Sequence, residues 1–184
     1  MGPGMSAFLR PAVAADAPAL AEIYGHHVRH GVGTFEEAVP SPEEMAQRLA
    51  AVQARGLPYL VAEQGGRMAA FAYASPFRLR AAYRYTVEDS VYVAPGLEGQ
   101  GLGRLSLTAV IEACTGLGLR QMTALIGDSG NAASIGLHRA LGFSHSGVMR
   151  AVGHKAGRWL DVVIMQLPLG AGDGDPPDAA GMTL

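Results

Sequence analysis

The spacing of hydrophobic and polar positions in this chain switches several times between the two-residue period of strands and the longer period of helices. Short alternating or continuous apolar runs predict strands over 8–13, 59–63, 68–74, 86–93, 122–126, 143–150 and 159–167. Apolar residues recurring every three or four positions predict a helix starting near residue 16 and others over 42–55, 103–117 and 131–141. The interleaving of strands and helices favours an α/β fold.

Polar residues and glycines mark the ends of several of these elements. Asp16 is predicted to cap the first helix, and Ser41 with Glu44 forms a capping box for the second. Gly65 and Gly66 lie between two strand runs and predict a hairpin turn.

The segment that joins the strand 86–93 to the next helix points most directly to a function. Its residues 95–104, PGLEGQGLGR, are rich in glycine and run into the start of a helix. Glycines permit positive φ, so successive N–H groups can point at one anion, and the helix adds the positive end of its dipole. The segment therefore predicts a phosphate cradle.

Two common phosphate-binding loops do not fit this spacing. A P-loop requires Gly-Lys-Ser/Thr where this chain has Gly103-Arg104-Leu105. The dinucleotide fingerprint requires glycine at a position occupied by Arg104 or by Ser106, depending on where it starts. A glycine-rich turn without any ligand remains an alternative for this segment alone.

A second motif lies downstream in 131–143, NAASIGLHRALGF. Together, the glycine loop and this helix resemble the coenzyme A pyrophosphate loop and the Asn-x-x-Ser helix of the GNAT family of N-acetyltransferases. Glu98 departs from the pattern, since the family usually has Gln or Arg there. The segments 75–80, 83–93 and 157–163 resemble the branch that acetylates phosphinothricin and methionine sulfone or sulfoximine.

The resemblance implies a GNAT fold, with a central mixed, mostly antiparallel sheet of about seven strands, splayed at strand 4 and flanked by about four helices. It places the domain at 7–168 and leaves 1–6 as an N-terminal extension. The tail 169–184 mixes Gly, Pro and Asp with little to bury, so we expect it to be disordered. The branch forms homodimers, and the apolar run 159–165 suits such an interface, although burial in its own sheet is the competing explanation.

The resemblance also implies acetyl-CoA as cosubstrate, with its pyrophosphate on the loop amides and its pantetheine arm beside the strand end. The cofactor-binding residues carried over are Val91, Tyr92, Val93, Glu98, Gly99, Gln100, Gly101, Leu102, Gly103, Arg104, Asn131 and Ser134. The N–H of Val93 would donate to the thioester oxygen as negative charge develops there. Asn131 is equally suited to cap a helix, and the two roles are compatible.

Acetyl transfer requires a group that takes a proton from the amine. Glu88 is the candidate general base, because a carboxylate partly buried in a central strand has a raised pKa. Asp89 is expected on the opposite face of the strand. The alternative for Glu88 is a salt-bridged strand residue without a chemical role. His138 occupies the position of a family tyrosine that protonates the CoA thiolate, and could instead be a second base or only hydrogen-bond within the site.

The substrate class is suggested by arginine and aromatic residues just before the strand 86–93. The branch resemblance implies a small anionic amino acid or analogue, anchored by Arg80 and Arg78 and hydrogen-bonded by Tyr83. Phe35 would wall the side-chain pocket, and Gly127 would bring backbone polar groups close to the substrate. A solvated surface charge cluster is the alternative for the arginines.

Composition excludes several other classes of function. The 184 residues, 49% of them hydrophobic, suit a single domain, and a formal net charge of −2 argues against nucleic acid or an anionic membrane as the main partner. The chain has no apolar run of roughly 18 residues and no secretory signal pattern, so we expect a cytoplasmic protein. Cys114 is the only cysteine and is expected to be buried, and the histidine spacing predicts no metal site.

Two classes of function remain. The first is an acetyl-CoA-dependent N-acetyltransferase acting on a small amino acid or analogue, with a protein N-terminal, peptide or simple-amine acetyltransferase as a variant of it. The second is a non-catalytic sensor that binds acetyl-CoA. Glu88 separates the two classes, because a sensor has no use for a base at the thioester.

Overall fold

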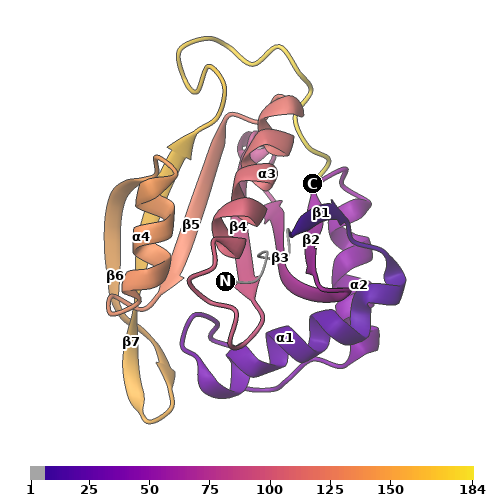
Figure 1. Cartoon of the computed structure of the whole chain (residues 1–184). Coiled ribbons are helices and arrows are strands. Elements are labelled where there is room, and N and C mark those ends of the chain that lie inside the picture. The colour runs from indigo at the N-terminus through magenta and orange to yellow at the C-terminus, as the bar shows by residue number, and fades with distance from the viewer. Residues whose placement is uncertain (1–6) are drawn as a thin grey trace.

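The computed structural model describes residues 7–184, which form a seven-stranded sheet flanked by four α-helices (Figure 1). The strand order is β1-β2-β3-β4-β5-β7-β6, and only the β4–β5 pair is parallel. The strands are β1 (Phe8–Pro11), β2 (Tyr59–Gln64), β3 (Arg67–Pro76), β4 (Thr86–Val93), β5 (Gln121–Gly127), β6 (Ser144–Lys155) and β7 (Arg158–Pro168). The helices are α1 (Ala17–His30), α2 (Pro42–Gln53), α3 (Leu102–Gly116) and α4 (Ala132–Ala140). The predicted mixed, mostly antiparallel sheet is confirmed.

The sheet splays between β4 and β5, as the family resemblance implies. Their parallel pairing covers only Thr86–Glu88 against Gln121–Thr123, whereas β4 stays paired with β3 as far as Val93. Beyond Glu88, the edge of β4 that faces β5 is therefore open (Figure 1).

The backbone register decides which groups face this gap. Ala94 N–H donates to Ala69 at 2.8 Å and Phe77 N–H donates to Thr86 at 3.2 Å, so the even-numbered residues of β4 bond to β3. Antiparallel strands alternate the direction of their backbone groups. The N–H and C=O groups of Val91 and Val93 consequently point toward the gap.

The helices cover the sheet through the apolar faces that the sequence predicts. α3 packs against β2, β3 and β4, while α1 and α2 pack against each other and against β3. On α1, Leu20, Ile23, Tyr24 and Val28 recur at helical spacing and are all buried. These contacts hold β4 rigidly at the centre of the molecule.

The two predicted helix caps have different outcomes. Ser41 Oγ accepts from Glu44 N–H at 3.2 Å and caps α2, as predicted. Asp16 does not cap α1 with its side chain, because its carboxylate instead accepts from Val13 N–H at 2.8 Å and from Arg10 at 2.7 Å. The predicted cap was therefore wrong: Asp16 stabilises the turn before the helix.

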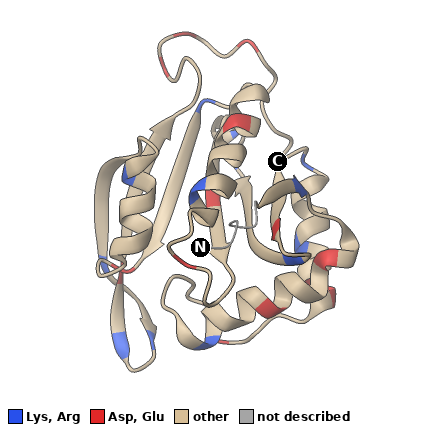
Figure 2. Ribbon diagram, viewed as in Figure 1, with Lys and Arg blue, Asp and Glu red and all other residues tan. Residues whose placement is uncertain are grey.

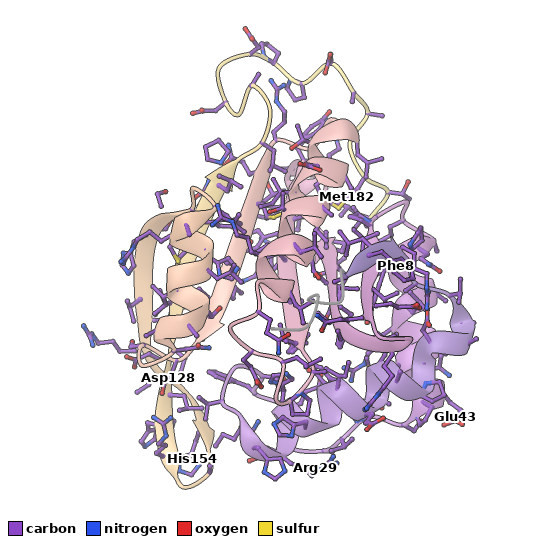
Figure 3. The ribbon with its side chains drawn as sticks, viewed as in Figure 1. Phe8, Arg29, Glu43, Asp128, His154 and Met182 are labelled. Carbon is purple, nitrogen blue, oxygen red and sulfur yellow. The ribbon has the colours of Figure 1, made fainter. Side chains whose placement is uncertain are left out.

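The tail after β7, for which the sequence predicts disorder, makes several contacts with the rest of the chain. It is drawn yellow in Figure 1 and runs over the top of α3, and Figure 3 places Met182 beside that helix. Met182 is 8% exposed and its N–H donates to Arg84 O at 2.9 Å, while Tyr85 OH donates to Ala179 O at 2.8 Å. A few apolar residues reach the core, although the tail is mostly Gly, Pro and Asp. The expected extension 1–6 lies outside the described residues.

Charged residues of both signs are spread over helices and strand ends in the ribbon of Figure 2. Within residues 7–184, no helix has the length and apolar character that crossing a membrane requires.

Candidate active site

A cavity of about 1200 Å³ opens where β4 and β5 separate. It is lined by the outer half of β4, the glycine loop, the end of β5, the start of α4 and the segment 31–35 after α1. Its volume is at or above the upper end of the roughly 300–1,000 Å³ range of small-molecule sites. The cavity therefore has room for a large cofactor together with a small substrate.

The glycine loop fits a phosphate group. Gly96, Gly99 and Gly101 have φ values of +81°, +75° and +83°, where a side chain would be strained. Gly101 is the N-cap of α3 and offers no side-chain acceptor, so the first N–H groups of the helix are free to bind an anion. A Cβ on Gly103 would lie 3.4 Å from Leu137 Cδ2 and 3.6 Å from Val93 Cγ2, in ordinary contact, so only a larger side chain would fill the space beside the cradle.

Glu98, which departs from the family pattern, binds within the loop itself. Its Oε2 accepts from Gly96 N–H at 2.8 Å. The carboxylate thus stabilises the turn that precedes α3. Glu98 lines the cavity, whereas Gln100, which was also predicted to bind the cofactor, does not.

The end of β4 is fixed by a side chain that the sequence did not reveal. His27 Nε2 lies 2.8 Å from Val93 O, one of the carbonyls that face the gap, and it donates to that oxygen. The N–H of Val93 faces the same gap. Residues 91–93 and His27 all line the cavity.

Asn131 and Ser134 lie at the start of α4, and both line the cavity. Asn131 Oδ1 accepts from Ser134 N–H at 3.2 Å, and Asn131 Nδ2 donates to Gly127 O at 3.0 Å. Asn131 is therefore the N-cap of α4 and also ties the helix to the end of β5.

Glu88 lies at the point where β4 and β5 part, and it lines the cavity. Burial and, to a smaller extent, the nearby charge of Asp89 raise the pKa of Glu88, Arg78 lowers it, and the net result is a pKa of about 7. Among residues 7–184 no ion pair involves Glu88. A carboxyl group with this pKa can take up and release a proton near neutral pH.

His138 is held by both of its ring nitrogens. Nδ1 lies 2.7 Å from Ser134 O, and Nε2 lies 3.0 Å from Asp89 Oδ2. His138 is 2% exposed and Asp89 is 7% exposed. Asp89, which alternation along the strand predicts to face away from Glu88, lines the same cavity as Glu88.

Phe35 and Gly127 lie together on the cavity wall. A Cβ on Gly127 would lie 2.6 Å from the Phe35 ring, and a Cβ on Gly153 of β6 would lie 2.3 Å from it. The ring therefore fits only because both positions are glycine. Lys155 Nζ donates to Thr34 O at 2.8 Å and ties the Phe35 segment to β6.

The predicted anion anchors lie outside the cavity lining. Arg78, Arg80 and Tyr83 are exposed, and the Arg78 guanidinium lies over the Phe77 ring at 4.3 Å. Arg78 is nevertheless close enough to lower the pKa of Glu88.

Arg158 of β7 does line the cavity, and the sequence did not single it out. Its Nη1 binds Asp128 Oδ2 at 2.7 Å. Figure 3 places Asp128 at the end of β5, below α4. In the part of the chain that the structure covers, no group of three His, Cys, Asp or Glu side chains could hold a metal ion.

Comparison with known proteins assigns the chain to a family. The model of the acetyltransferase (GNAT) family matches residues 26–143, which include the glycine loop and the helix that follows Asn131. The chain belongs to the acetyltransferase (GNAT) family.

Individual members of the family are similar over nearly the whole chain. A phosphinothricin N-acetyltransferase of Alcaligenes faecalis is 53% identical over 163 residues, which are 89% of this chain and 83% of the relative. An L-methionine sulfoximine/L-methionine sulfone acetyltransferase of Pseudomonas paraeruginosa is 45% identical over 169 residues, which are 90% and 96% of the two chains. A Sinorhizobium meliloti GNAT phosphinothricin acetyltransferase, crystallised with acetyl-CoA, has a TM-score of 0.91 at 49% identity and covers 94% of each chain.

Within this GNAT acetyltransferase, the structure gathers most of the predicted site residues around one cavity. The residues found only in the structure are His27, Asp89, Gly153, Lys155 and Arg158. Each of them acts through a partner distant in sequence, which a linear pattern does not identify.

Proposed function

We propose that this GNAT enzyme transfers the acetyl group of acetyl-CoA to the amino group of a small amino acid or analogue of the phosphinothricin, methionine sulfone or methionine sulfoximine type. Glu88 is its general base. The observation that supports this most is the buried Glu88 carboxyl, with its pKa raised to about 7, in the same cavity as the glycine loop. The activities named for the relatives support the substrate class.

Acetyl-CoA supplies the activated acetyl group, and this chain's backbone provides most of its site. The amides from Gly99 to Arg104 bind the pyrophosphate, because the loop leaves them without side-chain acceptors. The open edge of β4 pairs with the pantetheine arm as an added strand would. Val93 N–H donates to the thioester oxygen, and the bond from His27 to Val93 O holds the adjoining peptide group at the end of β4.

Glu88 takes a proton from the substrate ammonium, directly or through water, so that the neutral nitrogen can attack the thioester carbon. A C–N bond forms and the C–S bond breaks, and the electron pair of the C–S bond leaves with sulfur. The nitrogen then loses its second proton to solvent, Glu88 releases the first proton to solvent, and the thiolate takes up one proton when it is released.

A screen of CoA release tests this function. The expected result is turnover with phosphinothricin, methionine sulfone or methionine sulfoximine, and much slower turnover with short peptides and simple amines. Faster turnover with peptides would favour the protein N-terminal alternative. Binding of acetyl-CoA without turnover of any amine would favour the sensor.

A guanidinium is expected to anchor the substrate anion, because it can bind a carboxylate at two points. Arg80→Lys should raise KM for the free amino acid by about tenfold or more with little change in kcat, since the contact exists in both ground and transition states. Arg67→Lys, at an exposed position at the start of β3, is the matched control. If KM rises instead in Arg158→Lys, the anchor is the arginine that lines the cavity.

The proposed homodimer would cover apolar side chains of β6 and β7 that are exposed in the single chain. Within the run 159–165, Leu160, Val163 and Met165 are buried in the sheet, but Trp159 is 67% exposed and the neighbouring Val152 is 53% exposed. Burying these side chains between two copies would remove apolar surface from water. Light scattering at micromolar concentration should give the mass of a dimer. A fully active monomer at high micromolar concentration would contradict this proposal.

A further inference from the structure

Asp89 of β4 and His138 of α4 form a buried pair beside the proposed base, and the mechanism above gives Asp89 no role. The two side chains meet through Asp89 Oδ2 and His138 Nε2 at 3.0 Å, and both residues line the cavity. Their side chains are only 2% and 3% exposed, so water contributes little to the pair. A carboxylate in this setting requires a partner that stabilises its charge.

The bonds of His138 restrict where its protons lie. A carbonyl oxygen only accepts hydrogen bonds, so the bond from Nδ1 to Ser134 O requires a hydrogen on Nδ1. A second hydrogen must lie between Nε2 and the Asp89 carboxyl. The pair is therefore either an imidazolium beside a carboxylate or a neutral ring beside a protonated carboxyl.

The first of these states is favoured by the pair's own interactions. Burial lowers the pKa of His138, but the hydrogen bond and charge of Asp89 and the bond to Ser134 outweigh this and raise the pKa above its ordinary value. Asp89 Oδ1 is buried and has no hydrogen-bond partner within the described part of the chain. The imidazolium is consequently the main group that stabilises the Asp89 charge.

The elements packed around the pair bring no competing cation into direct contact with it. Cys114 of α3 stays neutral, because burial and the charge of Asp89 raise the pKa of its thiol to about 12. β5 has no titratable side chain, and the Phe143 ring meets His138 edge-on at 4.9 Å. On the cavity side lie Glu88 and Arg158, and the Arg158 guanidinium is bound to Asp128.

We propose that Asp89 is a positioning residue that holds His138 as an imidazolium on the cavity wall throughout the working pH range of the enzyme. The inference rests on the proposed acetyl transfer. A fixed positive charge there stabilises the departing thiolate electrostatically. Both N–H groups are already bonded, so donating a proton to sulfur would break the bond to Asp89 or to Ser134. The proton that completes the thiol therefore comes from solvent after release.

Nuclear magnetic resonance of the wild-type protein tests the protonation state without any turnover. Nitrogen-15 spectra of the histidine rings are recorded from pH 5.5 to 9, and His138 is assigned from its contact with the Phe143 ring. The expected result is an imidazolium spectrum for His138 at pH 8, well above the ordinary histidine pKa of about 6.5. A neutral ring at pH 7.5 would overturn the proposal.

Kinetics of Asp89→Asn give the second readout. An asparagine amide can donate to an unprotonated Nε2, so this variant should hold a neutral ring. The expected result is a fall in kcat of about 10- to 100-fold at pH 8, a smaller loss at pH 6, and a KM for acetyl-CoA within about twofold of wild type. Asp173→Asn, on the exposed tail, is the control for loss of one negative charge.

An unchanged kcat in folded Asp89→Asn, or the same loss at every pH, would overturn the proposal, because a merely structural role does not depend on the ring's protonation. If the variant does not fold, the wild-type spectrum still decides the question. Failure of the proposed function is distinct, since it appears as no CoA release by the wild-type enzyme with any amine.

Discussion

Glu88→Gln is expected to lower kcat at pH 7 by about 100-fold or more, the size of effect attributed to general base catalysis. The amide occupies the same volume on β4 but cannot accept a proton from the substrate ammonium. The affinity for acetyl-CoA should stay nearly intact, because the proposed contacts to the pyrophosphate and the pantetheine come from the glycine loop and the backbone of β4. Steady-state kinetics combined with calorimetric titration of acetyl-CoA would separate the two effects.

The same substitution should stabilise the fold at alkaline pH. The pKa of Glu88 is raised from 4.5 to about 7, so the native state binds this proton more tightly than the unfolded state. Its contribution to stability is fully present below about pH 4.5 and is lost as the pH rises through about 7. Glutamine does not ionise, so at pH 8 the variant should exceed wild type by up to about 3 kcal/mol in unfolding free energy.

Thermal unfolding of both proteins at pH 4.5 and pH 8 checks this result. The two melting temperatures should be similar at the lower pH and differ by several degrees at the higher one. Equal melting temperatures at pH 8 would mean that the carboxylate is well solvated, and a kcat within about twofold of wild type would show that Glu88 is structural.

Gly103→Val and Gly101→Val should each abolish the thermal stabilisation by acetyl-CoA. In the wild-type enzyme, ligand at about 100 times its Kd adds about 2.7 kcal/mol to the unfolding free energy. Valine at 103 would place methyl groups in the cradle, next to Leu137 and Val93, and valine at 101 would be strained at a φ of +83°.

Gly116→Val is the matched control for the glycine variants. It lies at the other end of α3, where an added Cβ meets no atom within 4 Å. This control should retain the full ligand-induced shift, whatever its own melting temperature. A normal ligand-induced shift in both loop variants would show that the glycine loop does not bind the pyrophosphate.

Local patterns were sufficient to predict most of the fold. The period of apolar positions located the strands and helices because each element buries one face, and the glycine loop was recognisable because positive φ favours glycine. The predicted Asp16 cap failed because two partners, Arg10 and the Val13 N–H, compete for the same carboxylate. In the tail, the burial of Met182 is a contact that average composition does not reveal.

Most of the candidate site residues that line the cavity belong to contiguous motifs of the sequence. His27 meets Val93 across 66 positions, and Lys155 meets Thr34 across 121. Alternation along β4 predicts that Glu88 and Asp89 point to opposite faces of the strand. It does not predict that α4 brings His138 into contact with Asp89. Such contacts between distant residues depend on how the helices pack against the sheet. The period of apolar positions does not determine that packing.

If the open edge of β4 binds the pantetheine arm as proposed, the enzyme recognises its acyl donor with main-chain atoms. Substitutions of the Val91 or Val93 side chain leave those amides in place, so affinity for the donor should tolerate sequence change at these positions. Side chains on β4 could therefore be changed to reshape the substrate pocket while binding of acetyl-CoA is kept. A proline at position 91 or 93 would instead remove the amide N–H itself.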